Sequence, residues 1–229
     1  MKHTKWILFV MLTLLANIAT AQPTDRHFIK QRIKEWGSCR TVAITRTGGD
    51  LAISGKNTFA SNGIPDELYN KLKSLKEQGS YIDDVILTEK GCWIVLYDKN
   101  DATWSAGIPI ALRDAILDFH KKDYYVRSIL FNDDMKWVIV AKEQFLTSDA
   151  EMTAYLKEKS EQYGALWSVT LGENGEYFAV YESGFAKQGT FQEDLMDAIR
   201  NTDLDYYRVK FAGASWFFAD EDGEYKFSM

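Results

Sequence analysis

Apolar and polar positions along the chain follow a rhythm that returns several times. A polar turn is followed by one aromatic residue and then by three or four apolar ones. The four copies are GCWIVLYDKN (91–100), DMKWVIVAKE (134–143), NGEYFAVYES (174–183) and, more loosely, GASWFFADED (213–222). Their aromatic residues are Trp93, Trp137, Tyr177 and Trp216, spaced by about 44, 40 and 39 residues. A period in this range indicates one supersecondary unit used repeatedly.

Each unit is predicted to contain more than the aromatic strand. A first strand and a polar hairpin turn precede it, the first strands being Val85-Ile86-Leu87, Ile129-Leu130-Phe131, Val169-Thr170-Leu171 and Val209-Lys210-Phe211. A third, shorter strand follows, for example at 103–105 and 144–146. Residues 42–44 and 51–53 form a degenerate first copy, in which Asp50 replaces the aromatic residue. We interpret that change as a terminal unit with relaxed packing.

Helices are predicted between the units. Apolar residues recur at helical spacing over 64–75 and 108–119, and residues 28–36 form one more helix before the first hairpin. Two helix starts read as capping boxes, Ser148 with Glu151 and Thr190 with Glu193. Two others begin Gly-Ile-Pro, at 63–65 and 107–109, where proline suits the first helical turn. These four starts occupy the same place in the unit, which supports the repeat.

The predicted fold class is α+β: about five helix-plus-three-stranded-meander units in one repeat domain, residues 22–229. The aromatic strands are apolar on both faces, which indicates cover on both sides, whereas the first strands alternate as in Val209-Lys210-Phe211 and should be covered on one face only. About fifteen strands in one open sheet would be unusual. We therefore expect a curled or closed, α/β-propeller-like array, with an open antiparallel sheet carrying helices on one face as the alternative. The units span about 24–60, 61–107, 108–148, 149–189 and 190–229.

Five α/β units in about 200 residues resemble the pentein-type α/β propeller in unit count and size. Catalytic penteins use a nucleophilic cysteine late in the chain, together with a histidine and acidic partners. No cysteine follows Cys92 here. The resemblance therefore implies an architecture without that chemistry.

The N-terminal segment reads as a cleaved secretory signal peptide, residues 1–21. A basic start precedes a mostly apolar stretch (6–16) and a small-residue cleavage site, Ala19-Thr20-Ala21. The apolar stretch is shorter than the ~20 residues that span a bilayer, and no membrane span is expected in the mature chain. The protein is thus predicted to be exported, periplasmic or extracellular. Its formal net charge of −6 and its lack of a basic cluster argue against nucleic acid as a partner.

Two cysteines remain after cleavage, Cys39 and Cys92. An exported chain with two cysteines suggests a disulfide, but the repeat places Cys39 before a first strand and Cys92 just after a hairpin turn. At ~3.3 Å per strand residue the two levels differ by roughly 20 Å, whereas a disulfide needs Cα atoms within about 7 Å. Two buried free thiols are expected.

Candidate chemistry is sparse. The two histidines after the signal, His27 and His120, lie on predicted helices, and no His or Cys pair has metal-ligand spacing. Neither a catalytic residue, a cofactor nor a metal is predicted. The carboxylates Asp133-Asp134 and Asp220-Glu221-Asp222 fall where the repeat requires turns. Two tryptophans outside the aromatic-strand position, Trp104 and Trp167, are the possible ligand contacts if they are exposed.

Two functional hypotheses remain. The first is an exported, non-catalytic binding or scaffolding protein whose repeat surface engages a protein or peptide. The alternative is a glycan-binding or glycan-hydrolysing envelope protein, in which closure of the array brings turn carboxylates such as Asp133 and Asp220 together. Hydrolysis would need two carboxylates within about 10 Å in a cleft.

Overall fold

A computed structural model describes residues 26–142 and 144–229, so the predicted signal peptide and its cleavage site lie outside the described residues. The described chain is an α+β fold with five helices and five three-stranded antiparallel sheets. The helices are α2 (His27–Trp36), α3 (Asp66–Gln78), α4 (Ile110–Lys121), α5 (Ala150–Tyr163) and α6 (Glu193–Arg200). The sheets are β1 (Thr41–Ile44), β2 (Asp50–Ser54) and β3 (Thr58–Asn62); β4 (Ile82–Leu87), β5 (Trp93–Tyr97) and β6 (Asp101–Trp104); β7 (Val126–Phe131), β8 (Trp137–Ala141) and β9 (Phe145–Thr147); β10 (Leu166–Leu171), β11 (Tyr177–Tyr181) and β12 (Gly184–Gln188); β13 (Arg208–Ala212), β14 (Ser215–Ala219) and β15 (Tyr225–Ser228).

Each sheet is a meander of consecutive strands that follows its own helix. The aromatic residues hold matching places: Leu87 pairs with Trp93, Phe131 with Trp137, Leu171 with Tyr177 and Phe211 with Trp216. Among the described residues no strand pairs with a strand of another unit, so the alternative of one continuous open sheet is wrong.

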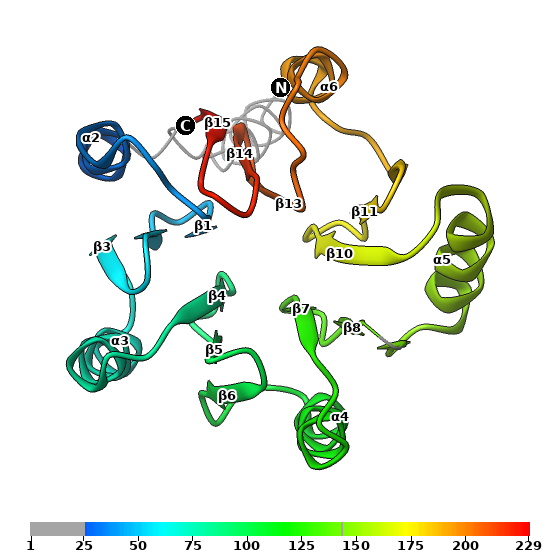
Figure 1. Cartoon of the computed structure of the whole chain (residues 1–229), viewed down its shortest axis with the longest axis horizontal. Helices are drawn as coiled ribbons and strands as arrows, with labels where there is room; N and C mark the ends of the chain where they lie inside the picture. The colour runs from blue at the N-terminus through cyan, green and yellow to red at the C-terminus, as the bar shows by residue number, and fades with distance from the viewer. Residues whose placement is uncertain (1–25, 143) are drawn as a thin grey trace, which may run out of the picture.

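The first strands of the units, β1, β4, β7, β10 and β13, lie side by side around the middle of the molecule, and we call them the inner strands. Each contacts the inner strand of the next unit, and β13 contacts β1. The helices lie on the outside, as Figure 1 shows. The apolar face of α3 packs between the first and second sheets, with Leu68, Leu72 and Leu75 against residues of both. Among the described residues the units are thus held together by apolar packing and by single hydrogen bonds, such as Ser168 Oγ to Tyr207 O at 2.6 Å, and not by strand pairing.

Three details of the helix starts differ from prediction. The N-cap of α5 is Asp149, whose Oδ1 accepts from Met152 N at 2.9 Å, while Ser148 Oγ accepts from Trp137 N instead. At α6 the N-cap is Gln192, without a side-chain cap bond, so Thr190 does not cap that helix. Pro65 and Pro109 are N-caps in an extended conformation, one position before the predicted first turn. The helices begin slightly later than the motifs suggested because the chain leaves the third strand extended.

The prediction that the inner strands are covered on one face only is wrong. Their side chains are buried on both faces for most of their length, including Lys210 at 6% exposure. One face packs toward the helices, and the other meets the inner strands of the other units. A charged residue on the second face is therefore buried in the middle of the molecule.

The interpretation of Asp50 as relaxed packing is also wrong. Asp50 pairs with Ile44 at the place that the aromatic residues occupy elsewhere, and it is buried. Its Oδ1 accepts from Arg26 Nε at 2.8 Å, and Arg26 Nη1 donates to Ser215 Oγ at 2.6 Å in the last unit. Helix α2 follows at once, packing Ile29 and Ile33 beside Phe217 of the last sheet. A buried ion pair within the first unit, which we call the closure pair (Arg26 and Asp50), thus positions Arg26 to bond the last unit at Ser215.

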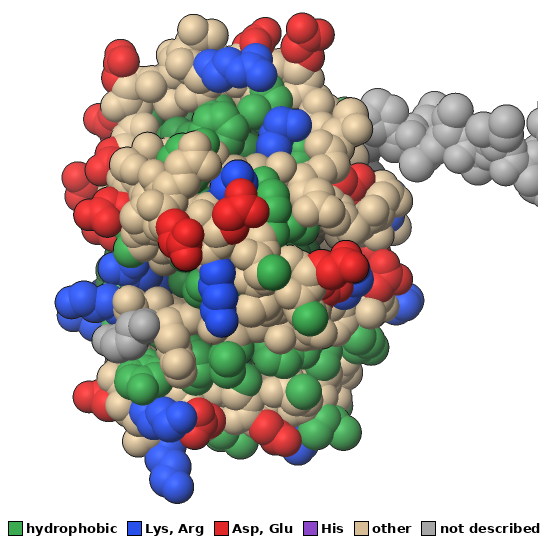
Figure 2. All heavy atoms as spheres, turned by 90° about the vertical axis from the view of Figure 1, so that its right-hand side faces the viewer, with side chains coloured by type: hydrophobic (Ala, Val, Ile, Leu, Met, Phe, Trp, Pro, Cys, Tyr) green, Lys and Arg blue, Asp and Glu red, His purple; other side chains and the backbone are tan. Residues whose placement is uncertain are grey.

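The surface is mixed in charge where it can be seen. On the face shown in Figure 2, acidic and basic side chains are interspersed, with apolar side chains between them. Within the described residues, no helix has both the length and the apolar character to cross a membrane.

Candidate functional site

A polar layer lies at one level of the inner strands. In each unit, one residue of the inner strand pairs with the aromatic position of the second strand, which is Asp50 in the first unit. Three positions before that residue, every inner strand has a buried polar side chain. These five residues are Thr41, Asp84, Ser128, Ser168 and Arg208. Apolar residues fill the helix-facing side of the same strands. The repeat therefore encloses a polar centre inside an apolar wall.

The central charge cluster consists of Asp84, Arg208 and Lys210. Asp84 is fully buried, and its Oδ2 lies 3.0 Å from Lys210 Nζ and 3.4 Å from Arg208 Nε. Its Oδ1 accepts from Thr41 Oγ1 at 2.6 Å. Burial by itself would raise the pKa of Asp84, but the charges of Lys210 and Arg208 hold that pKa below its ordinary value. The carboxylate is thus ionised and bound from two sides.

Arg208 reaches across the middle of the molecule. From the fifth unit, its Nη1 donates to Asp83 O at 2.9 Å in the second unit and its Nη2 donates to Arg127 O at 3.0 Å in the third. The guanidinium lies over the Tyr207 ring, 4.4 Å from its centroid. Both terminal nitrogens of Arg208 thus bond backbone carbonyls of other units, while its Nε has no hydrogen bond in the described chain. Arg208 therefore acts as a tie between units, and less of it is free for a ligand.

A β-bulge recurs at the start of three inner strands. The register shifts between Ile82 and Asp84, between Val126 and Ser128, and between Leu166 and Ser168. The extra residues are Asp83, Arg127 and Trp167. Bulges re-aim side chains and often lie beside functional sites. Here two of the three extra residues, Arg127 and Trp167, line a hollow.

That hollow, which we call the strand-start mouth, has a volume of about 450 Å³. It combines three aromatic rings, two arginines and four carboxylates from three units: Tyr125, Trp167, Tyr207, Arg127, Arg208, Asp205, Asp220, Glu221 and Asp222. Tyr125 is exposed, and Trp167 is half-buried against the core. Asp220 caps its turn by accepting from Gly223 N at 2.8 Å. Asp205, Glu221 and Asp222 make no hydrogen bond to another described residue.

The sequence-predicted ligand contacts separate in space. Trp167 lines the strand-start mouth, whereas Trp104 is half-buried against the core and lines none of the hollows described here. The turn carboxylates separate too. Asp220 lines the strand-start mouth, but Asp133 lies on the β7–β8 turn, at the other end of the inner strands, where it accepts from Lys90 N at 3.1 Å. The structure does not bring Asp133 and Asp220 into one cleft.

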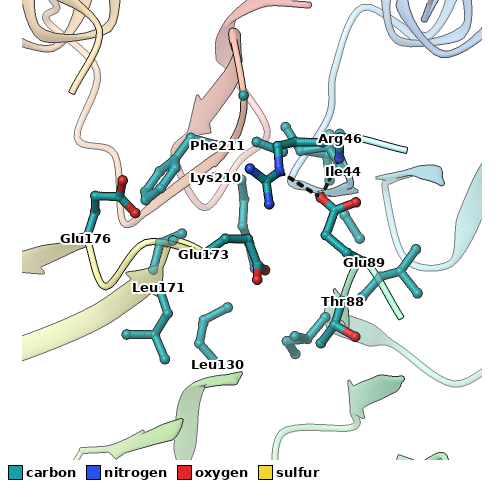
Figure 3. A pocket seen from close by; sticks show the side chains of 18 of the residues that line it. Ile44, Arg46, Thr88, Glu89, Leu130, Leu171, Glu173, Glu176, Lys210 and Phe211 are labelled. Carbon is teal, nitrogen blue, oxygen red and sulfur yellow. Dashed lines mark hydrogen bonds and ion pairs between the residues drawn. The ribbon is translucent and has the colours of Figure 1, made fainter. Parts of the chain in front are cut away.

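A second hollow lies at that other end, beside the hairpin turns, and we call it the hairpin-end cavity. Its volume is about 190 Å³, and apolar residues such as Leu130, Leu171 and Phe211 form much of its wall. Figure 3 shows the Glu173 side chain pointing toward its middle and Arg46 paired with Glu89 at 3.7 Å. The central charge cluster lies between the two hollows, and Lys210 lines the cavity.

The remaining candidates lie away from both hollows. Cys39 and Cys92 are free thiols; Cys39 is buried, but Cys92 is only half-buried, contrary to prediction. His120 is exposed at the end of α4, with Nδ1 3.1 Å from Asn100 O. The described residues contain no group of His, Cys, Asp and Glu suited to hold a metal ion.

Sequence reasoning missed the central charge cluster and the bulge residues. Asp84 belongs to the carboxylate pair Asp83-Asp84, whose sequence neighbours give no sign of a buried cation, and Lys210 alternates with Val209 and Phe211 in a strand predicted to be covered on one face. A usable signal existed, because oppositely charged residues interrupt otherwise apolar inner strands: Asp83 and Asp84 in one, Arg208 and Lys210 in another. Comparison with known proteins adds no assignment: no protein-family model matches this chain, and neither the curated proteins nor the solved structures gave a significant match.

Proposed function

We propose that this protein is an exported, non-catalytic binding protein whose five units form a closed, propeller-like array. Support for closure comes from the contact of β13 with β1 and from the closure pair, which ties the first unit to Ser215 of the last. A closed array holds the ends of its inner strands in fixed relative positions. Side chains from different units can then form one preorganised surface, which reduces the entropic cost of binding.

The partner that fits best is a protein or peptide presenting a basic side chain at the strand-start mouth. The observation that carries this proposal is the convergence of three aromatic rings and four carboxylates there. Aromatic faces attract cations, and carboxylates add charge complementarity. Arg127 and Arg208 also line the mouth, but Arg208 is already bonded to backbone carbonyls. Three carboxylates have no hydrogen-bond partner in the described chain: Asp205, Glu221 and Asp222. Their negative charge therefore favours a positively charged ligand.

Binding is favoured over turnover by the separation of the carboxylates. The hydrolase hypothesis pairs Asp133 with Asp220, which lie toward opposite ends of the inner strands. Glycan binding without hydrolysis remains the second candidate, since Trp167 and Tyr125 offer ring faces beside polar groups. A ligand titration separates the two.

The test is calorimetric titration of the mature protein with a lysine-rich peptide, a glutamate-rich peptide of the same length and a neutral oligosaccharide. We expect the lysine-rich peptide to bind and Tyr125→Ala to weaken it about tenfold, a typical loss for an aromatic contact at an interface. Tyr69→Ala removes an equally exposed tyrosine far from the mouth and should leave affinity unchanged. Binding of the oligosaccharide alone would favour the glycan alternative, and equal losses in both variants would remove the mouth from the proposal.

Export has its own test. N-terminal sequencing of the secreted or periplasmic protein should give Gln22 as the first residue. A mature species that retained Trp6 would show that the signal peptide prediction is wrong.

A further inference from the structure

The hairpin-end cavity has features that the proposed function does not use. It lies at the other end of the inner strands from the strand-start mouth, and it is smaller and more enclosed by apolar side chains. An apolar cavity of about 150 Å³ can hold a molecule as large as benzene. At about 190 Å³, this one admits a small organic group or the end of a long side chain.

The cations beside this cavity already have partners. Arg46 Nε lies 3.7 Å from Glu89 Oε1, and Lys210 Nζ lies 3.0 Å from Asp84 in the central charge cluster. Since the Lys210 ammonium is turned to Asp84, its aliphatic stem is the part available to the cavity. Each cation thus already has a carboxylate beside it, which weakens its attraction for an anionic ligand.

One carboxylate at the cavity is different. Glu176 accepts from Asn174 N at 3.0 Å and Glu89 from Thr47 N at 3.1 Å, but Glu173 has no hydrogen bond or ion pair with any described residue. In Figure 3 it points toward the middle of the cavity. A half-buried carboxylate that faces a cavity without a partner is the group that a ligand cation would satisfy.

The surrounding charges favour the same ligand. Burial raises the pKa of Glu173, and the nearby carboxylates Asp133, Glu89 and Asp134 raise it further, against the opposing charge of Arg46. Lys90 does not supply the missing charge, because its Nζ donates to Asp133 O at 3.2 Å. A bound cation would relieve this repulsion.

A second, independent group points to a ligand. Thr88 is 3% exposed, lines the cavity, and its Oγ1 has no hydrogen-bond partner in the described chain. A buried hydroxyl without a hydrogen-bond partner destabilises the folded protein. A ligand N–H would satisfy it.

We propose that the hairpin-end cavity binds an alkylammonium group, with the carbon chain against Leu130, Leu171 and Phe211 and the ammonium bound by Glu173. Thr88 supplies a further oxygen on the wall. A metal ion fits less well, since the described residues contain no group of His, Cys, Asp and Glu suited to hold one and apolar side chains such as Leu130, Leu171 and Phe211 form much of the wall. The ammonium can come from a small free amine or from the lysine side chain of a peptide.

The test compares ligands of one size and different charge. Calorimetry at pH 7 with n-pentylamine, 1-pentanol, pentanoate and Nα-acetyl-lysine-methylamide separates charge from apolar fit. We expect the amine to bind at least about tenfold more tightly than the alcohol, and pentanoate not to bind, because only the cation complements Glu173. Tighter binding of the lysine derivative than of pentylamine would identify a peptide as the source; the reverse would identify a free amine.

Variants locate the site. Glu173→Gln keeps the size of the side chain and should lose the preference for amine over alcohol, whereas Glu161→Gln, an exposed glutamate on α5, should keep it. Affinity of the unmodified protein for pentylamine should fall as pH is lowered through the raised pKa of Glu173, because the protonated carboxyl no longer attracts the cation. Equal affinity for pentanol and pentylamine, or an unchanged preference in Glu173→Gln, would overturn the proposal. Neither result bears on the proposal that the strand-start mouth binds a basic side chain, because the Tyr125→Ala variant tests that proposal separately.

Discussion

Two of the places where the described chain buries charge, the central charge cluster and the closure pair, differ in design. In the central charge cluster, one carboxylate, Asp84, is shared by Lys210 and Arg208 from a unit that is not its neighbour along the chain. In the closure pair, Asp50 meets the single cation Arg26 at the junction of the first and last units. Both sites are buried, and both join distant parts of the chain, the closure pair through the hydrogen bond from Arg26 to Ser215.

The difference lies in what happens when one partner is lost. Removal of Asp84 leaves two buried cations, and Arg208 cannot release its proton at accessible pH. Removal of Arg26 leaves Asp50, whose pKa burial already raises despite the charge of Arg26, so protonation can neutralise it. Loss of a partner should therefore destabilise the protein more at the central charge cluster than at the closure pair. In the closed array that we propose, the closure pair is where the first and last units would separate.

The largest effect is expected for Asp84→Asn. The substitution keeps the shape but removes the charge that compensates Lys210 and Arg208, so we expect a loss of about 3–5 kcal/mol in the free energy of unfolding. Urea unfolding followed by far-UV circular dichroism measures it. Asp118→Asn, on the exposed face of α4, is the control and should change stability by less than about 0.5 kcal/mol. A loss under 1 kcal/mol for Asp84→Asn would show that the cluster is hydrated.

Arg26→Met should cost less, about 2–3 kcal/mol, because the stranded Asp50 can take up a proton. The same urea unfolding measurement applies. Adding Asp50→Leu removes the stranded carboxylate and should recover much of the loss, since apolar residues of similar size often replace a buried ion pair at little cost. If Arg26→Met is as costly as Asp84→Asn, the two sites do not differ in the way described here.

Acidification gives a smaller and more selective effect. Asp84 has a lowered pKa in the folded protein, so its contribution is present above the unfolded pKa of about 3.9 and is lost as pH falls through the folded value. The stability difference between the natural protein and Asp84→Asn should therefore shrink below about pH 4.

Asp50 behaves oppositely. The pKa of its carboxyl is raised in the folded protein, so protonation favours the folded state and the contribution of Asp50 to stability rises as pH falls. Asp50→Asn should remove that rise. Unfolding free energies at pH 7, 5 and 3.5 distinguish the two carboxylates.

The smallest effect is a change in local opening at the closure. Cys39 lies beside it, with its backbone N–H bonded to Gly223 O at 2.9 Å, and burial raises the pKa of its thiol to about 12. In the native protein Cys92 should react first with iodoacetamide, because Cys39 is both shielded and protonated. Arg26→Met should speed alkylation of Cys39 without a matching change at Cys92, as peptide mass mapping would show.

The number of alkylated cysteines in the denatured protein tests whether Cys39 and Cys92 are free thiols. Denaturation without reductant should expose two alkylatable cysteines, and the absence of label would show that Cys39 and Cys92 form a disulfide. Equal acceleration of both thiols in Arg26→Met would indicate global unfolding in place of local opening.

The elements of the repeat could be predicted from the sequence because their signals are local. Hairpin turns, two-sided apolar strands and helical spacing each depend on neighbours within a few residues, and the predicted aromatic strands at Trp93 and Trp137 are those of the structure. Helix starts could be predicted only to within one or two residues. Ser148 and Thr190 satisfy a capping pattern, but the structure places the caps at Asp149 and Gln192, because the path of the preceding strand decides where the first turn begins.

By itself, the sequence determined the helix-and-meander units, their number and the place of the aromatic residues, since hydrophobic periodicity and turn chemistry act along the chain. Only the tertiary structure decided which polar residues meet. Asp84 and Lys210 are 126 positions apart, and Arg26 and Ser215 are 189 apart; no local pattern relates them. The same applies to the two hollows, because the mouth containing Trp167 and the cavity containing Glu173 exist only where side chains from several units converge. Charge pairing and concave surfaces depend on distances between units, and those distances are set by packing around a common centre.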